Sequence, residues 1–572
     1  MIGFILEIPF IKKVTGLSEL FVKKPVVELH YDNELYEFIV WGDPVVINGF
    51  LERFHQDKSI EFIINNLYGH YYYLLLNKVS GSISMGNSLF SLLPVYYSVS
   101  TDKISFSENA LSLGKHLAKS KINKRFILET LLFNYPLFNG SIFEDIKLLP
   151  SNSYVRLSGS GVNIVKHTVI QEYFSKNPEP WKKSFEKMRD IFLSAALKYL
   201  PEERYFNALT GGFDGRTLVS AGLFHKKLFS SYCFGTTSSK DTRIASDLAR
   251  EARLSHANIE LDDNYVKNDS LALGREFIIN SSGTATFARA HYLHAAKKLS
   301  DGYYYIITGN FGSEVFRAAH MAGAVISSNL FNLFDTVDPV EGMSRVENSM
   351  EFQCLNRDAF KMEIDSLRED IAKLPCFDNS YTGLTKNQRF YVFVFEEMFR
   401  KYFGAEMINQ FRYIKNRTPF LDIEFLKEIF KTELAGIHSD FFEHSPFKRY
   451  KGQVLYAHII KKAYPDFGKM LTDKGYKPND LIHPLGKLNI AKGYLKKIMR
   501  KTTPDFDPYS VNRAWEYNKN IWQKVPIPGD LFNIKSLEEL PKEILFKVLS
   551  LSYFVDSLPQ RREDAKEIHL AP

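Results

Sequence analysis

One octapeptide, Leu209-Thr210-Gly211-Gly212-Phe213-Asp214-Gly215-Arg216, constrains the fold of this chain more than any other segment. It follows the short apolar run Tyr205 to Leu209, which is typical of a strand, and precedes Thr217 to Leu223, which is typical of a helix start. A strand, a Gly-Gly turn and a helix N-terminus form an anion site, because backbone N–H groups and the helix dipole face the ligand. The glycines let the backbone approach a ligand where a side chain would clash.

A carboxylate in the same loop indicates which kind of anion would bind there. Asp214 suits a magnesium ion that is carried by bound phosphates, so the loop predicts a nucleoside-triphosphate site. No Gly-Lys-Ser/Thr follows, so the loop is not a Walker loop. The alternative is a plain strand-to-helix turn, in which Gly-Gly beside Asp is common.

Composition excludes several classes of protein. The chain has 572 residues, enough for two or three domains, with 45 % hydrophobic and 24 % charged residues, as in ordinary soluble proteins. A net charge of +7 is mild for this length and predicts no nucleic-acid partner. No apolar run is long enough for a bilayer, and the start, Met1 to Glu7, indicates a strand and not a signal peptide. Without a CxxC pair, neither a disulfide framework nor a zinc site is expected, and the cytoplasm is the expected compartment; the cysteines are Cys233, Cys354 and Cys376.

The pattern of elements changes along the chain. Residues 1 to about 165 are rich in candidate strands, at Tyr36–Trp41, Tyr71–Asn77, Val95–Val99 and Tyr154–Leu157. After a linker at 176–180, strands alternate with helices: strands at Tyr205–Leu209, Phe229–Phe234, Ala257–Leu261 and Tyr303–Thr308, helices at Asp241–Arg253 and Thr286–Leu299. This alternation predicts a parallel sheet with crossover helices, followed by a mostly helical region from about 320 to 572.

A second loop with similar chemistry follows the strand Tyr303 to Ile307. It runs from Thr308 to Glu314 through Gly309 and Gly312 and precedes a predicted helix. Ligands of open α/β sheets lie beyond the carboxyl ends of the strands, so the two loops should meet there. Asp214 and Glu314 could then hold one magnesium ion between them. Alternatively, Glu314 is an acid that faces the dipole of its own helix.

A third strand-to-helix connection, Phe234 to Asp241, lies between these loops in the sequence. Phe234 could pack on an adenine, although a phenylalanine at a strand end is more often part of a core. Asp241 is better explained as a helix cap than as a ligand. His256 begins the next strand and is more often structural than catalytic in such a position.

These segments, in this order, resemble the asparagine synthetase family, whose relatives include β-lactam synthetases and lasso-peptide cyclases. Thr210 to Gly215 is similar to the family's Ser-Gly-Gly-x-Asp-Ser loop, and Thr308 to Phe316 resembles its Ser-Gly-x-Gly-x-Asp-Glu loop. Arg417 to Asp422 resembles its Arg-x-Pro-Phe-Leu-Asp signature. Ser88 to Asn109 and Phe143 to Pro150 resemble its glutaminase-type domain, so the likeness covers most of the chain.

The resemblance implies an α/β fold with two parts. Residues 1–170 would form an Ntn-type αββα sandwich, and residues 180–572 a parallel-sheet ATP-pyrophosphatase domain, of the adenine nucleotide α hydrolase type, with a helical C-terminal extension. It implies ATP and Mg²⁺ as cofactors, with Asp214 and Glu314 on the metal. The implied ATP-binding residues are Leu209, Thr210, Gly211, Gly212, Asp214, Gly215, Arg216, Phe234, Thr308 and Gly309.

The family also places a catalytic lysine late in the chain. Between Lys448 and Lys501 there are 14 Lys and Arg but only three acids, all Asp. Such a bias could neutralise pyrophosphate or attract an anionic substrate, although most of these residues are better explained as a solvated basic face. Lys474, in Asp473-Lys474-Gly475-Tyr476, is the best match to the catalytic lysine, and Lys451 is the second.

Departures from the family pattern limit the chemistry. A working glutaminase domain needs a cysteine directly after the initiator Met, whose thiolate attacks glutamine, but position 2 is Ile2 and no cysteine precedes Cys233. Glutamine hydrolysis is therefore not expected. In the second loop, the family's metal-binding Asp falls on Ser313 without a gap and on Glu314 with one, and the second option is preferred because it keeps a carboxylate. The family's amine-deprotonating residue falls on Asn310 or Phe311, neither of which is a base.

The sequence thus predicts an ATP-dependent ligase that adenylates a carboxylate, releases pyrophosphate and transfers the acyl group to an amine. The partners would be a small-molecule or peptide carboxylate and an amine or ammonia, and a partner protein could supply ammonia or substrate. Three alternatives stay open: synthesis of asparagine or amidation of a sugar acid with ammonia, closure of a peptide macrolactam as in lasso cyclases, and a non-catalytic pseudoenzyme.

Overall fold

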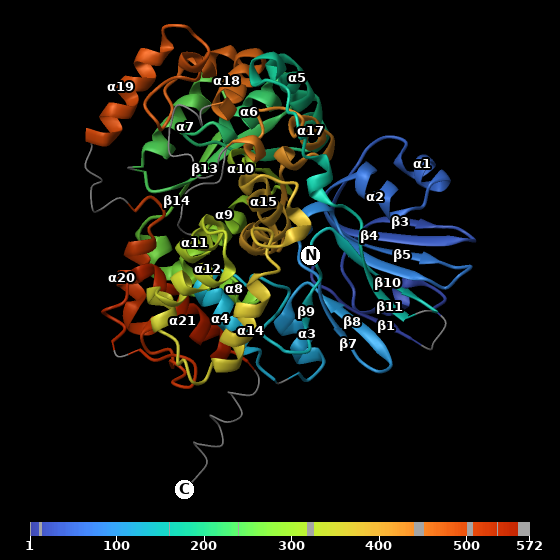
Figure 1. Cartoon of the computed structure of the whole chain (residues 1–572). Helices are drawn as coiled ribbons and strands as arrows, with labels where there is room; N and C mark the ends of the chain where they lie inside the picture. Colours follow the sequence, from blue (N-terminus) through green and yellow to red (C-terminus); the bar gives the residue numbers. More distant parts are fainter. Residues whose placement is uncertain are drawn as a thin grey trace.

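The computed structural model describes residues 2–10, 14–119, 121–159, 161–237, 239–316, 325–439, 451–499, 507–534 and 536–558. Figure 1 shows a blue, strand-rich part that packs against the side of a larger, mainly helical part. The fold is mixed α/β, with antiparallel and parallel sheets, as the sequence predicts. No helix in the described ranges is both long and apolar enough to cross a membrane.

The strand-rich part, here called the two-sheet region (residues 2–166), contains two antiparallel sheets. The first has the order β2 (Phe21–Lys23), β1 (Ile5–Pro9), β8 (Lys103–Ser107), β7 (Tyr96–Val99), β9 (Lys147–Leu148). The second has the order β11 (Gly161–Lys166), β10 (Ser153–Ser158), β6 (Ile83–Asn87), β5 (Leu67–Asn77), β4 (Tyr36–Val46), β3 (Val27–Asp32). The strands expected near residues 5, 36, 71, 95 and 154 are confirmed.

Alternating side chains explain how these sheets stack. Along β4, Ile39 and Trp41 belong to the core between the sheets, whereas Phe38 and Val40 belong to a second cluster with Phe54. Successive residues of a strand face opposite sides, so both faces of β4 are buried. The outer cluster includes residues of α1 (Phe50–Gln56) and α2 (Ile60–Asn66), and α3 (Ala110–His116) contacts strands of the other sheet.

The second part contains a parallel sheet, as the alternation of strands and helices predicts. Its order is β14 (His256–Glu260), β13 (Phe229–Gly235), β12 (Tyr205–Ala208), β15 (Tyr305–Ile307), β16 (Lys415–Arg417). The chain moves from β12 outward to β14 and then returns to place β15 on the other side of β12. This reversal is a topological switch point, the place at which open α/β sheets usually bind their ligands.

Most of the other described elements are helices, and one of them, α4, lies within residues 2–166. Before residue 325 they are α4 (Lys124–Phe133), α5 (Trp181–Tyr199), α6 (Asp214–Phe224), α7 (Lys240–Glu251), α8 (Ser270–Asn280), α9 (Ala290–Leu299) and α10 (Gly312–Phe316). Later ones are α11 (Ser328–Asp335), α12 (Pro339–Glu347), α13 (Met350–Gln353), α14 (Lys361–Ile371), α15 (Lys386–Phe393), a π-helix (Val394–Phe403), α16 (Gly404–Gln410), α17 (Ile423–Ile429), α18 (Lys451–Ala463), α19 (Gly486–Met499), α20 (Val511–Trp522) and α21 (Lys542–Asp556).

Candidate active site

The loop after β12, here called the glycine loop (209–213), and the start of α6 leave no room for a side chain at Gly211 or Gly215. A Cβ atom on Gly215 would lie 2.5 Å from the carbonyl oxygen of Ala208, and one on Gly211 would lie 2.7 Å from Oδ1 of Asp241. The Gly211 N–H donates to Asp241 Oδ1 at 3.2 Å, and the Gly212 N–H donates to Thr210 Oγ1 at 3.3 Å. A bound phosphate would therefore compete with two long internal hydrogen bonds.

Asp214, the first residue of α6, is where the two strand-end loops meet. Ser313 Oγ, from the loop after β15, donates to Asp214 Oδ2 at 3.0 Å. The Tyr456 hydroxyl, from α18, donates to Asp214 Oδ1. A Cβ on Gly312 would lie 2.7 Å from Asp214 Oδ1, so a glycine is needed for the loop to come this close.

The structure brings Ser313 to Asp214, which is the pairing that a match without a gap gives. The backbone carbonyl of Glu314 accepts a hydrogen bond of 2.7 Å from the Tyr391 hydroxyl, and a metal role for its side chain stays a prediction. Within the described residues, no three His, Cys, Asp or Glu side chains form a metal-binding group. One carboxylate beside a hydroxyl still fits Mg²⁺, because this ion is commonly held by one or two carboxylates together with substrate phosphates.

Arg216 has a structural task in this loop. Its buried guanidinium donates to the carbonyl oxygens of Phe467, Met470 and Leu471 at 3.0, 2.9 and 2.8 Å. Burial lowers the pKa of Arg216 to about 10, although the nearby Asp473 opposes this shift. The side chain predicted at the nucleotide thus holds the segment 467–471 against the glycine loop.

The two candidate lysines occupy different surroundings. The segment that carries Lys474 lies on the glycine loop, because the Asp473 N–H donates to the Gly211 carbonyl at 3.0 Å and Lys474 Nζ lies 5.2 Å from the centre of the Phe213 ring. Lys451 Nζ instead lies 3.8 Å from Glu433 Oε2. The ends of the basic stretch, Lys448, Arg449, Arg500 and Lys501, lie outside the described residues.

Phe234 lies near the end of β13 in a group of aromatic rings. Its ring centre is 5.7 Å from those of His291 and Tyr509 and 5.6 Å from that of Tyr292. The ring is half-buried and near the carboxyl end of the strand. Stacking of Phe234 on an adenine stays a prediction.

A buried carboxylate that the sequence reasoning missed lies beside the second loop. Asn310 Nδ2 donates to Glu406 Oε1 at 3.0 Å, and Arg289 Nη2 donates to Glu406 Oε2 at 3.3 Å. Burial raises the pKa of Glu406, although Arg289 opposes this effect. Nothing local marks Glu406 as a site residue, since it lies 96 positions after Asn310; the available signal is an acid in an otherwise buried helix, α16.

Comparisons with known proteins add little. No protein-family model matches the chain. No curated protein matches it in sequence. Among solved structures, it is similar to glutamine phosphoribosylpyrophosphate amidotransferase from B. subtilis complexed with ADP and GMP, with 9 % identity and a TM-score of 0.16. This weak similarity covers 43 % of this chain and about half (49 %) of that chain.

The described residues also form a cavity of about 660 Å³ in the two-sheet region, over the outer face of the second sheet. Its walls include Lys58, Glu61 of α2, and Tyr154, Arg156 and His167 around β10 and β11. None of the predicted nucleotide residues lines it. The candidate active site therefore rests on the strand-end loops and not on this cavity.

Proposed function

We propose that this protein is an ATP-dependent ligase that adenylates a substrate carboxylate and transfers the acyl group to an amine. The observation that carries the proposal is the meeting of the glycine loop and the second loop on Asp214 at the switch point of a parallel sheet. Sites of this kind suit phosphates, because N–H groups of loops and helix starts face them.

Different residues of this chain would bind the metal ion and the phosphates. Asp214 and Ser313 would hold Mg²⁺, which supplies positive charge against the ATP phosphates. Lys474, whose segment packs against the glycine loop, would stabilise negative charge that develops on the leaving pyrophosphate. The carboxylate substrate attacks the α-phosphorus, its bond to pyrophosphate breaks, and the amine later displaces AMP from the acyl-adenylate.

The amine must lose a proton in the second step, and Glu406 is our candidate acceptor. The loop positions at which the family has a base hold Asn310 and Phe311, which cannot take a proton. Asn310 of the second loop is hydrogen-bonded to Glu406, so this carboxylate contacts the loop directly. A carboxylate whose pKa is raised by burial is a stronger base than one in water.

The two-sheet region contains no cysteine, which fits an enzyme without its own glutaminase. Ile2 is buried, and its apolar side chain has no nucleophilic atom. We therefore propose that the amine, or free ammonia, enters directly.

A non-catalytic nucleotide-binding or protein-binding role is the second candidate. It is favoured by the serine that replaces a carboxylate opposite Asp214 and by the internal acceptors that engage two loop N–H groups. Such a protein would bind partners without turning over ATP.

Two measurements separate these functions. The first is binding of MgATP by calorimetry, which needs no substrate. The second is ATP–pyrophosphate exchange with aspartate, uronic acids or a cell extract as the carboxylate source. The ligase requires exchange that Asp214→Ala abolishes while circular dichroism stays unchanged. Binding without exchange from any source would favour the non-catalytic role, and no binding would reject the nucleotide site.

A further inference from the structure

Two opposed residues of the two-sheet region contact the strand beside the second loop. Asp43 on β4 and His70 on β5 are directly paired across the sheet. Asp43 forms a bidentate ion pair with Arg417, with Nε–Oδ2 and Nη2–Oδ1 distances of 2.8 and 2.9 Å. His70 Nε2 lies 2.8 Å from Thr418 Oγ1. All four residues are buried.

The backbone is built for this contact. Gly42 and Gly69, which flank the pair, have φ of +109° and +87°. A Cβ on Gly69 would lie 2.2 Å from the Asp43 carbonyl oxygen, and one on Gly42 would lie 2.8 Å from the His70 carbonyl oxygen. Both positions therefore require glycine, and they directly precede the two residues that contact Arg417 and Thr418.

Strand β16 links these contacts of Asp43 and His70 to the second loop. The Thr308 N–H donates to the Arg417 carbonyl at 3.1 Å, and Thr308 Oγ1 donates to Asn416 Oδ1 at 2.8 Å. The Arg417 guanidinium also lies 4.3 Å from the centre of the Tyr305 ring on β15. The first residue of the second loop is thus fixed to the strand that Asp43 and His70 hold.

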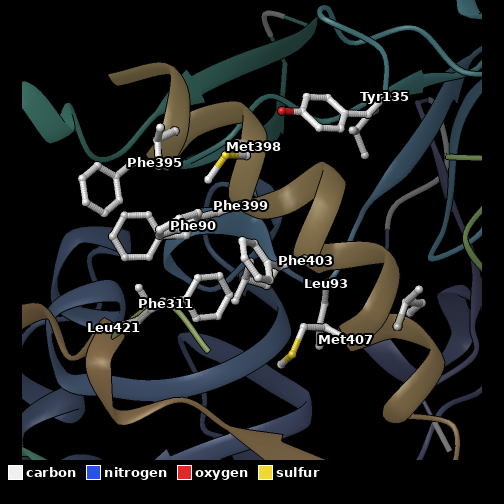
Figure 2. Close-up of a cluster of buried hydrophobic side chains, with 14 of the residues drawn as sticks. Phe90, Leu93, Tyr135, Phe311, Phe395, Met398, Phe399, Phe403, Met407 and Leu421 are labelled. Carbon is white, nitrogen blue, oxygen red and sulfur yellow. The ribbon is translucent and has the colours of Figure 1, made fainter. Parts of the chain in front are cut away.

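An apolar contact reaches the same loop independently. Figure 2 shows Phe90, from the two-sheet region, and Phe311, from the second loop, in one cluster with Phe399 and Phe403. Phe311 lies 4.6 Å from Phe399 and 4.7 Å from Phe403, and Phe90 lies 6.1 Å from Phe399, between ring centres. Phe90 and Phe311 both have positive φ, +64° and +73°, which is strained for a bulky residue and must be held by its surroundings.

We propose that the two-sheet region acts as a positioning element for residues 308–313 of the second loop, through Asp43 and Phe90. Resting on the proposed function, this assigns a task to a region that has no nucleophilic cysteine. Asp43 fixes the start of the loop through Arg417, and Phe90 fixes its centre through Phe399 and Phe311. Ser313 then reaches Asp214 from a loop held at both points.

Hydrogen exchange of the ligand-free protein tests the positioning directly, because it needs no activity. We expect Asp43→Asn and Phe90→Leu to reduce protection of the amides of 308–313 by about 2- to 30-fold, the usual range for coupling between sites. MgATP affinity should fall by a similar factor. Phe54→Leu is the matched control, since Phe54 is equally buried but lies on α1 in the outer cluster. It should lower stability without a change in the loop.

A double variant guards against simple misfolding. Asp43→Asn leaves Arg417 charged and buried, whereas Asp43→Asn with Arg417→Gln restores a neutral hydrogen-bonded pair, which should return loop protection to near wild type. Equal loss of loop protection in Phe54→Leu, or unchanged loop protection in both Asp43→Asn and Phe90→Leu, would overturn the proposal. If wild-type protein binds no MgATP, the ligase proposal fails. The hydrogen-exchange data then still decide whether the two-sheet region positions the second loop.

Discussion

Ser313 Oγ donates a 3.0 Å hydrogen bond to Asp214 Oδ2, and this bond joins the segments that follow the adjacent parallel strands β12 and β15. A serine at this point leaves one carboxylate where two would bind a divalent cation more tightly. The same contact is the pairing expected from the match without a gap, because it places Ser313 against Asp214, and a metal role for Glu314 stays a prediction.

Adding a carboxylate at this contact should strengthen metal binding. We expect Ser313→Asp to lower the Mg²⁺ concentration needed for half-maximal ATP binding by about 10-fold, comparable to the effect of groups that support a metal site. Without metal, the new charge should repel Asp214 and lower the melting temperature. Glu314→Gln is the control and should change the Mg²⁺ dependence little. The reverse result, with a response to Glu314→Gln alone, would favour the match with a gap.

Glu406→Gln should separate the two half-reactions of the proposed ligase. Loss of a proton acceptor usually costs about 10²- to 10⁴-fold in rate, so amide formation should fall by that factor while ATP–pyrophosphate exchange continues. Because burial raises the pKa of Glu406, the rate of the wild type should rise with pH through a pKa above the ordinary 4.5. This limb should be absent in the variant. Equal loss of both half-reactions would show that Glu406 holds the site together instead.

Much of the fold is predictable from the sequence, whereas the contacts around Asp214 are not. The candidate strands Tyr36–Trp41 and Tyr71–Asn77 predicted β4 and β5, and the strand–helix alternation predicted the parallel sheet. The partners of Asp214 and Asn310 come from distant helices: Tyr456 lies 242 positions after Asp214, and Glu406 lies 96 positions after Asn310. Such pairs depend on how helices pack, and no local pattern records that.

The dependence on contacts with distant segments also explains why the sequence alone suggests a nucleotide contact for Arg216. Its place in a nucleotide loop suggested a ligand contact, but the segment 467–471 supplies three carbonyl acceptors that only the folded chain brings there. Sequence patterns identify a loop that can bind an anion, and they do not show which of its side chains other parts of the chain already engage.

Arg216→Lys should destabilise the protein. An ammonium cannot reproduce the planar set of donors that serves three carbonyls, and hydrogen bonds to charged groups are each worth about 1.5–3 kcal/mol. We expect a loss of about 2–4 kcal/mol in unfolding free energy, measured by urea denaturation. Protease cleavage within 467–471 should become faster. A stability within error of wild type would show that these carbonyls are satisfied by other donors.

Lys474 and Lys451 should differ in their effect on turnover. Lys474 lies on the glycine loop, so Lys474→Met should reduce ATP–pyrophosphate exchange by about 10²- to 10³-fold, as loss of one charge-stabilising donor does elsewhere. Lys451 is half-exposed and paired with Glu433 at 3.8 Å, and Lys451→Met should cost at most about 1 kcal/mol of stability. The opposite ranking of the exchange rates would assign the catalytic role to Lys451.

Acid should weaken the contact between the two-sheet region and the parallel-sheet region through His70. Burial lowers the pKa of His70 to about 4 in the folded protein, from 6.5 when exposed. Between these values the unfolded chain binds the proton more tightly, so the stability contributed by His70 is complete above pH 6.5 and is lost as pH falls toward 4. The pKa difference corresponds to a loss on the order of 3 kcal/mol. His70→Gln, which retains a hydrogen-bonding group for Thr418, should flatten the pH dependence of the melting temperature in this window relative to wild type. If the two proteins show parallel curves, His70 is not among the groups that make the fold sensitive to acid.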